Sequence, residues 1–313
     1  STIKFIEQYE NIKNIHVVWF GGEPLLGIKQ IESLYRKMIL IPDKNYSFSI
    51  ISNGFLISPD IIKLFKEMKL QHIQITLDGL KETHNKIKFT KNENDTFSRT
   101  IKNIDLLASS APEIRISIRV NMNKENSSEF ITLYSFILQR YKSNPLIGIY
   151  PAFITSTSSK SSSSCSLLFN RQEKSEFIQQ LYYDRGIVTN LCGYPDSSFT
   201  ECSIRNKHTF TIDPEGYLYK CWEIIGDQKY AIAKLDSEGT IQSIDQKILN
   251  RYLYAADPLE DKTCSKCPYL PICFGGCPHK RIENIFKDKH YDTCTYLKGS
   301  LKEFIKIHLS QNS

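Results

Sequence analysis

Nine cysteines are the residues of this chain whose type and spacing can do chemistry. The chain has 313 residues, and its first 164 contain no cysteine. The nine are Cys165, Cys192, Cys202, Cys221, Cys264, Cys267, Cys273, Cys277 and Cys294. An odd count without a secretion signal argues against a disulfide framework. Thiolates packed this closely are typical metal ligands, so we predict metal sites in the C-terminal half.

Seven of these cysteines fit one spacing formula. Thirteen residues separate Cys202 from Gly216, and four more separate Gly216 from Cys221. The formula continues with Cys264-x2-Cys267-x5-Cys273-x3-Cys277, and sixteen further residues lead to Cys294. Structural zinc ions and iron–sulfur clusters each take four thiolates, so eight cysteines would make two sites of either kind. Cys192 is the natural eighth, and Cys165, in a serine-rich stretch, is predicted to be unligated.

The N-terminal half alternates predicted strands and helices. The predicted strands are 15–20, 46–51, 72–77, 114–120 and 146–153, and the predicted helices are 1–10, 28–40, 58–70, 96–108 and 127–141. Repeated units of this kind imply an α/β fold with a parallel sheet and right-handed crossovers. The short apolar run 15–20 is typical of a strand buried on both faces of such a sheet.

The composition and the predicted secondary structure of the sequence change near residue 190. Before it, residues 155–166 are polar and of low complexity, which predicts a flexible loop, and residues 171–183 return to helical spacing. Beyond it come short strands, turns and most of the cysteines, with a hairpin predicted over 208–220 and a last helix over 295–309. We therefore predict a domain boundary near residue 190.

The seven-cysteine formula resembles the SPASM domain, the C-terminal extension of radical S-adenosylmethionine (SAM) enzymes that mature peptides and proteins. The resemblance runs over residues 191–309 and implies two auxiliary [4Fe–4S] clusters. It implies that the first cluster uses Cys192, Cys202, Cys221 and Cys277. It implies that the second uses Cys264, Cys267, Cys273 and Cys294.

Gly21-Gly22-Glu23-Pro24 follows the first predicted strand and resembles the SAM-binding motif of the same family. The two glycines expose backbone groups, and Glu23 supplies an anion suited to a ligand ammonium. Pro24 restricts the backbone where the chain leaves the loop. By the same resemblance, the ends of the next two strands hold the ribose and carboxylate of SAM. The residues implied there are Asn53, Thr76 and Asp78. An ordinary strand-end turn is the alternative for each of these loops.

The resemblance implies a partial (β/α)6 radical SAM barrel over residues 1–190, lacking its first βα unit, followed by a SPASM domain over residues 191–313. The family's CxxxCxxC motif, which holds the SAM-binding cluster, is not in this chain. The chain starts with Ser1, about where the helix after that motif would end. We therefore expect a chain truncated ahead of Gly21. A pseudo-enzyme without the SAM cluster is the alternative.

The implied function is that of a radical SAM peptide maturase, an oxidoreductase that generates a 5′-deoxyadenosyl radical and oxidatively modifies a ribosomal peptide, for example by a thioether crosslink. Sulfatase-maturing members place an aspartate after the cysteine that corresponds to Cys221. Here Trp222 stands there, which favours peptide-crosslinking relatives. Glu223 is the candidate catalytic base, with a surface carboxylate as the alternative interpretation.

Other function classes are a sulfatase-maturing enzyme, a zinc-ribbon module, and a non-catalytic scaffold or electron-transfer protein that binds a precursor peptide. The expected partners are a precursor peptide or protein and an electron donor such as flavodoxin or ferredoxin. The 40 basic and 34 acidic residues are interleaved, so the net charge of +6 does not indicate nucleic-acid binding. No apolar run predicts a membrane span. Radical chemistry on exposed clusters implies a reducing cytoplasm.

Overall fold

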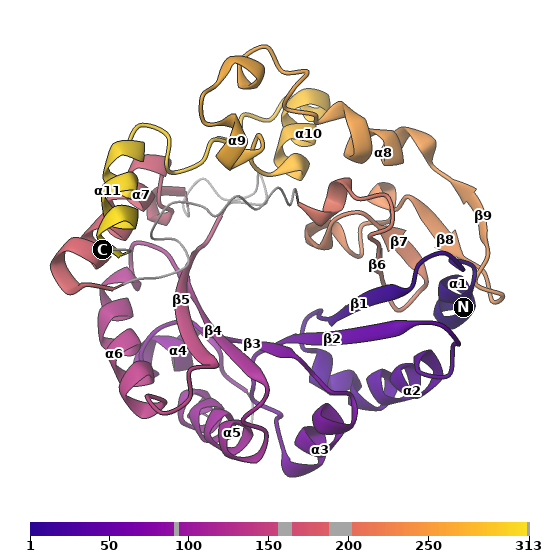
Figure 1. Cartoon of the computed structure of the whole chain (residues 1–313), viewed down its shortest axis with the longest axis horizontal. Helices are drawn as coiled ribbons and strands as arrows, with labels where there is room; N and C mark the ends of the chain where they lie inside the picture. Colours follow the sequence, from indigo (N-terminus) through magenta and orange to yellow (C-terminus); the bar gives the residue numbers. More distant parts are fainter. Residues whose placement is uncertain (91–93, 156–164, 188–201, 312–313) are drawn as a thin grey trace. The chain divides into compact units, whose positions relative to one another are not determined.

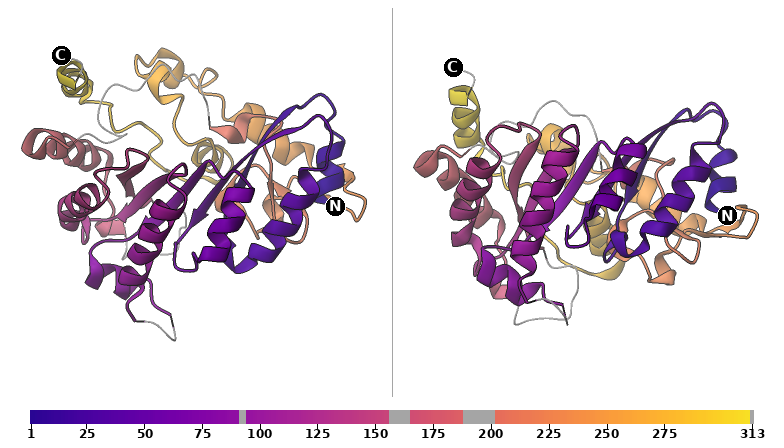
Figure 2. Two further views of the ribbon diagram at one scale, coloured as in Figure 1. Left: turned by 60° about the horizontal axis from the view of Figure 1, so that its bottom comes forward. Right: turned by 90° about the horizontal axis from the view of Figure 1, so that it is seen from below.

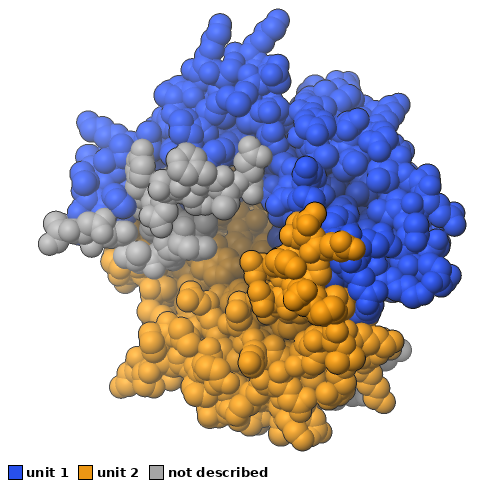
Figure 3. All heavy atoms as spheres, turned by 45° about the vertical axis from the view of Figure 1, so that its right-hand side comes forward, with its two compact units in different colours: residues 1–9, 171–179, 192–313 blue, residues 10–170, 180–191 orange. Residues whose placement is uncertain are grey.

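The computed structural model describes residues 1–90, 94–155, 165–187 and 202–311. Its contacts divide the chain into two compact units (Figure 3). The sheet unit comprises residues 10–170 and 180–191, and the cysteine unit comprises residues 1–9, 171–179 and 192–313. The division at 191/192 lies beside the predicted domain boundary. Residues 1–9 and 171–179, which the sequence assigns to the barrel, instead make their contacts within the cysteine unit.

The sheet unit is built on five parallel strands that follow one another in chain order. They are β1 (Asn14–Trp19), β2 (Asn45–Ser52), β3 (His72–Leu77), β4 (Arg115–Met122) and β5 (Ile147–Phe153). The intervening helices are α2 (Ile28–Met38), α3 (Pro59–Glu67), α4 (Lys81–Ile87), α5 (Thr96–Ser110) and α6 (Phe130–Arg140). Helices α2, α3, α5 and α6 run along one side of the strands (Figures 1 and 2). This arrangement confirms the predicted α/β fold with a partial barrel.

Helices on one side only give the sheet two different faces. Along β3, the buried side chains Ile73, Ile75 and Leu77 alternate with the half-buried Gln74 and Thr76. Strand β4 repeats the pattern, with isoleucine and valine buried and polar side chains on the alternate positions. The period of two therefore separates an apolar face under the helices from a polar inner face.

The expectation that residues 15–20 form a strand buried on both faces is wrong. Side chains of β1 alternate between exposed and half-buried, and none of them is fully buried. In the described part of the chain β1 pairs only with β2, so it lies at the end of the strand order. Helices cover only one side of this strand, which leaves Val18 37% exposed although it is apolar.

Local signals place most helix starts correctly. Ser58 caps α3 by accepting a hydrogen bond from the backbone N–H of Ile61 at 3.4 Å, and Pro59 occupies the first turn. Asp95 caps α5 in the same way through Ser98. Helix α4 was not expected, because its sequence is polar and carries no apolar stripe. Its single buried side chain is His84.

The cysteine unit contains a four-stranded antiparallel sheet. Its strands are β6 (Thr211–Ile212), β7 (Tyr217–Tyr219), β8 (Ala233–Leu235) and β9 (Ile241–Ile244). The predicted hairpin is confirmed by β6 and β7, which turn at Gly216 with φ of 86°. Strands β8 and β9 were not expected.

The helices of this unit are short. They are α1 (Thr2–Glu7), α8 (Gln246–Asn250), α9 (Leu270–Cys273), α10 (Pro278–Lys287) and α11 (Leu301–Gln311), and α7 (Arg171–Arg185) belongs to both units. Helix α11 begins six residues later than predicted, because residues 295–300 are in turns. No helix in the described ranges is both long and apolar enough to cross a membrane.

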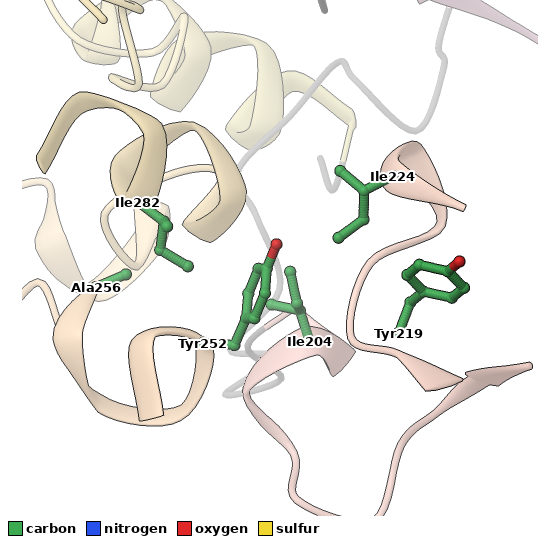
Figure 4. Close-up of a cluster of buried hydrophobic side chains, with 6 residues drawn as sticks. All are labelled: Ile204, Tyr219, Ile224, Tyr252, Ala256 and Ile282. Carbon is green, nitrogen blue, oxygen red and sulfur yellow. The ribbon is translucent and has the colours of Figure 1, made fainter. Parts of the chain in front are cut away.

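Two apolar clusters hold the cysteine unit together. In the first, α1 contributes Phe5, which packs edge-to-face on Tyr9 and Phe210 beside strands β7 and β8. This packing explains why residues 1–9 belong to the C-terminal unit. The second cluster, drawn in Figure 4, comprises Ile204, Tyr219, Ile224, Tyr252, Ala256 and Ile282. Cys221 packs against it, so this cluster positions one of the predicted ligands.

Candidate functional site

The loop after β1 is joined to the end of β2 through Glu23. One carboxylate oxygen accepts hydrogen bonds from Leu25 N at 3.0 Å and Ser52 Oγ at 2.8 Å, and the other accepts one from Asn53 N at 2.8 Å. Pro24 opens the short 3-10 turn η1 (Pro24–Gly27). The structure thus brings the predicted residues Glu23 and Asn53 together and leaves Gly21 and Gly22 exposed beside them.

Helix α5 fixes the loop after β2. Asn103 donates hydrogen bonds from Nδ2 to the carbonyls of Gly54 at 2.9 Å and Phe55 at 2.8 Å. Gly54 has φ of 74°, and a Cβ there would lie 3.0 Å from Ile75, so this position requires glycine. Sequence reasoning missed Asn103, because its partners lie 48 and 49 residues away.

Asp78, at the end of β3, is only 4% exposed. Its Oδ1 accepts a hydrogen bond from Asn121 Nδ2 at 3.1 Å. Its Oδ2 lies 3.4 Å from Lys88 Nζ and accepts no hydrogen bond from the described residues. A buried carboxylate oxygen in this state is a strong acceptor for a ligand hydroxyl.

A row of polar side chains leads from Asp78 across the inner face of the sheet. Arg119 donates from Nε to Asn121 Oδ1 at 2.9 Å, and it also hydrogen-bonds the Tyr150 hydroxyl. Tyr150 donates in turn to Gln74 Oε1 at 2.7 Å. The predicted Thr76 pairs with Arg119 in the register of β3 and β4. The alternation of polar and apolar residues along β4 was the sequence signal that could have identified this row.

Asn126 and Glu129 brace the backbone around Asp78. Asn126 is 5% exposed and donates from Nδ2 to the carbonyls of Asp78 at 2.7 Å and Asn121 at 2.9 Å. Glu129 accepts a hydrogen bond from Leu80 N at 2.6 Å. At Gly79, φ is 145° and a Cβ would lie 2.5 Å from a Glu129 carboxylate oxygen. The backbone after β3 is thus held from the start of α6.

Replacing Asn126 by alanine is expected to lower the free energy of unfolding by about 2 kcal/mol, because two buried carbonyl groups lose their donor. Urea denaturation followed by circular dichroism measures the change. The matched control is Asn45→Ala, which removes an exposed asparagine pair and should change stability by less than about 0.5 kcal/mol. Equal effects of the two substitutions would contradict the bracing role of Asn126.

Four of the predicted metal ligands line one hollow in the cysteine unit. The cysteines that line this hollow are Cys264, Cys267, Cys273 and Cys294. They come from a 3-10 turn, the residue after it, the end of α9 and the segment before α11. Gly276 permits this fold, because a Cβ there would lie 1.8 Å from the carbonyl oxygen of Thr293. These are the four residues that the family resemblance assigns to the second cluster.

Three further cysteines gather elsewhere in the unit. Burial raises the pKa of Cys221 to about 12, and the nearby Cys277 and Cys202 add to that rise. Burial likewise raises the pKa of Cys277. These are three of the four residues assigned to the first cluster, and the fourth, Cys192, lies outside the described residues. Metal binding must overcome the raised pKa values, because only the thiolate is a ligand.

Within the described ranges, no three His, Cys, Asp or Glu side chains lie close enough together to hold a single metal ion. A four-iron cluster spreads its four thiolates over a larger cage than one zinc ion does. The four cysteines line one common hollow, which fits a shared group with four thiolate ligands.

The candidate base Glu223 lies in the 3-10 turn after Cys221 and is exposed. Its charge contributes to the raised pKa of both Cys221 and Cys277, so the carboxylate lies near the first group of cysteines. Trp222 beside it is 58% exposed. Glu223 is therefore placed to exchange protons at this group of cysteines.

Residues 2–137 match the family model of the radical SAM superfamily. The cysteine-type anaerobic sulfatase-maturating enzyme of Clostridium novyi is 25% identical over 305 residues, which cover 87% of this chain and 75% of that protein.

Solved structures share the fold. The chain superposes on native anSMEcpe with bound AdoMet and Cp18Cys peptide with a TM-score of 0.68 at 19% identity, over 99% of this chain and 87% of that one. It superposes on Streptococcus suis SuiB bound to precursor peptide SuiA with a TM-score of 0.57 at 14% identity, over 94% and 68% of the two chains.

Proposed function

We propose that this chain is a radical SAM oxidoreductase that modifies a side chain of a ribosomal peptide or protein, supported by the match of residues 2–137 to the radical SAM superfamily model. The observation that carries this proposal is the hollow lined by Cys264, Cys267, Cys273 and Cys294. Members of the family use [4Fe–4S] clusters and SAM, which together supply one-electron radical chemistry when bound.

The first part of the proposal concerns cluster ligands. We assign Cys264, Cys267, Cys273 and Cys294 to one auxiliary cluster, supported by their common hollow. We assign Cys202, Cys221 and Cys277, together with Cys192, to the other. The charges of Cys277 and Cys202 both raise the pKa of Cys221, which supports that grouping.

The second part concerns SAM. Buried Asp78 has one carboxylate oxygen that pairs with Lys88 but accepts no hydrogen bond from the described residues, which suits a ribose hydroxyl. Asn53 follows the neighbouring strand β2, and Thr76 lies on β3 two residues before Asp78. Glu23 already accepts three hydrogen bonds, so its main role is to hold the loop that presents Gly21 and Gly22 to the ligand. One remaining lone pair is available to a ligand ammonium.

A peptide substrate is supported by the structures of anSMEcpe and SuiB, which are described with bound peptides. A crosslink such as a thioether is the first candidate product, because Trp222 replaces the aspartate expected of sulfatase-maturing members. Sulfatase maturation is the second candidate, favoured by the relative from Clostridium novyi that matches along 87% of the chain. In either reaction Glu223 is the proposed base.

The test is anaerobic reconstitution of the full-length protein, followed by measurement of iron, sulfide, zinc and 5′-deoxyadenosine release from SAM. Mass spectrometry then examines a cysteine-containing sulfatase peptide and a candidate precursor peptide. Loss of two hydrogens indicates a crosslink, whereas replacement of the thiol by an aldehyde indicates sulfatase maturation. Iron-loaded protein that leaves SAM intact would support a scaffold role instead, and zinc without iron would refute both.

Exposed iron–sulfur clusters require a reducing environment, so we propose that the reaction takes place in the cytoplasm with flavodoxin or ferredoxin as electron donor. Both points depend on the cluster assignment.

A further inference from the structure

The two cysteine groups differ in the charges beside their sulfur atoms. In the group around the hollow, Arg281 Nη1 lies 3.3 Å from Cys264 Sγ, and Lys298 Nζ lies 3.6 Å from Cys294 Sγ. Arg281 is only 6% exposed, so water screens its charge weakly. The cationic donors therefore belong to the proposed second cluster.

Arg281 is held in place from three directions. Its Nε donates to the carbonyl of Ala256 at 3.2 Å, and its Nη2 pairs with Asp261 Oδ2 at 3.2 Å. The other carboxylate oxygen of Asp261 accepts a hydrogen bond from Cys264 N at 2.8 Å. Asp261 therefore fixes both the guanidinium and the backbone of the cysteine that it contacts.

The same arginine connects the two groups through α10. This helix starts directly after Cys277, and Arg281 N donates to the carbonyl of Cys277 at 3.1 Å. One helical turn thus joins a ligand of the proposed first cluster to the cation beside a ligand of the second. Helix α10, which carries Arg281, is labelled in Figure 1.

The other group also has a carboxylate as its neighbour, but the described residues place no side-chain cation beside it like the one that pairs with Asp261 next to Cys264. Glu223 lies two residues after Cys221, in the 3-10 turn Trp222–Ile224, and its charge acts on both Cys221 and Cys277. The hydrogen bonds to these two sulfurs come from backbone N–H groups of Glu223, His279 and Lys280. No side-chain cation contacts their sulfur atoms among the described residues.

We propose that Arg281, assisted by Lys298, raises the reduction potential of the cluster bound by Cys264, Cys267, Cys273 and Cys294 above that of the other auxiliary cluster. The inference rests on the cluster ligands given under the proposed function. Reduction adds one electron and one negative charge to a cluster. A fixed cation and an N–H···S hydrogen bond stabilise the reduced state, whereas a nearby carboxylate destabilises it.

The test is a redox titration of the reconstituted full-length protein, followed by EPR. Arg281→Met keeps much of the apolar stem and removes the charge and the donors. In this variant the midpoint potential of the higher-potential auxiliary cluster is expected to become more negative by at least about 59 mV. For a one-electron couple this shift is a tenfold change in the reduction equilibrium constant. The other wave should stay within a factor of two. Arg281→Lys should recover part of the shift, which a purely structural role would not produce.

Two surface substitutions complete the design. Lys298→Gln should move the same wave in the same direction by a smaller amount, and Glu223→Gln should move the lower wave to more positive potential. Lys302→Gln, which removes an exposed lysine in α11, is the control and should move neither wave.

An unchanged higher wave in Arg281→Met with full iron content would overturn the inference. If Arg281→Met takes up less iron, the test rests on Lys298→Gln. An unchanged midpoint potential of the higher-potential auxiliary cluster in Lys298→Gln would contradict the role of the cations. Failure of the wild-type protein to bind two auxiliary clusters would instead refute the proposed function. Iron analysis of each sample therefore separates the two failures.

Discussion

Replacing Cys267 and Cys273 together by serine is expected to lower the iron content of the reconstituted protein by about four atoms per chain. Both thiols line the same hollow, so the double variant leaves one cluster with only two of its four ligands. The cysteines assigned to the first cluster are untouched and should keep their iron. Colorimetric iron and sulfide assays after anaerobic reconstitution measure the loss, and peptide modification should fall below detection.

Pairs of substitutions within one cysteine group or across both groups test which cysteines share a cluster. Cys221→Ser with Cys277→Ser should also cost about four irons, whereas Cys221→Ser with Cys267→Ser crosses the two groups and should cost about eight. Cys165→Ser is the control and should leave the iron content unchanged. A crossed pair that costs only four irons would show that the two cysteines serve one cluster, which contradicts the proposed ligand sets.

Lowering the pH from 6.5 to 4 is expected to remove up to about 3 kcal/mol from the free energy of unfolding through His84 alone. His84 is 1% exposed, and its Nδ1 accepts a hydrogen bond from Asp78 N at 3.2 Å. Burial lowers the pKa of His84 to about 4, from an ordinary value of 6.5. The unfolded chain therefore binds a proton below pH 6.5, while the folded chain does so only near pH 4. Stability is fully present above pH 6.5 and is lost as the pH falls through this window.

Urea unfolding at a series of pH values measures this effect in the wild-type protein and in His84→Asn. The asparagine side chain offers an acceptor to Asp78 N but does not titrate. The variant should show a shallower loss of stability between pH 6.5 and 4, and the two proteins should differ less at pH 4 than at pH 7. Parallel curves would mean that other groups carry the acid sensitivity.

Local sequence determined the elements of the sheet unit. The five strands of the sheet were predicted within two residues at each end, because each is a short apolar or alternating run bounded by turn residues. Ser58 and Pro59 marked the start of α3 for the same reason, since a capping hydroxyl acts on a backbone N–H three residues away. The cysteine spacing belongs to this class as well, because it is a pattern along the chain.

Predictions from local sequence were wrong or missing where the contact that fixes the structure involves a residue distant in sequence. The exposure of the β1 side chains depends on which face of the strand the helices cover. The unexpected helix α4 is anchored by the hydrogen bond from Asp78 N to His84. Asn126 reaches the carbonyl of Asp78 across 48 residues, and Glu129 reaches Leu80 across 49. No periodicity can reveal such pairs, since they exist only once β3 and β4 lie side by side.

The cysteine unit shows the same division. The sequence by itself determined that thiolates are concentrated here and that eight of them suffice for two clusters. Only the tertiary structure decided that Cys264 receives a hydrogen bond from Arg281, 17 residues later, and that Glu223 lies near Cys277 as well as Cys221. Charge acts through distance in space, and folding alone brings these charges to within a few ångströms of the sulfur atoms.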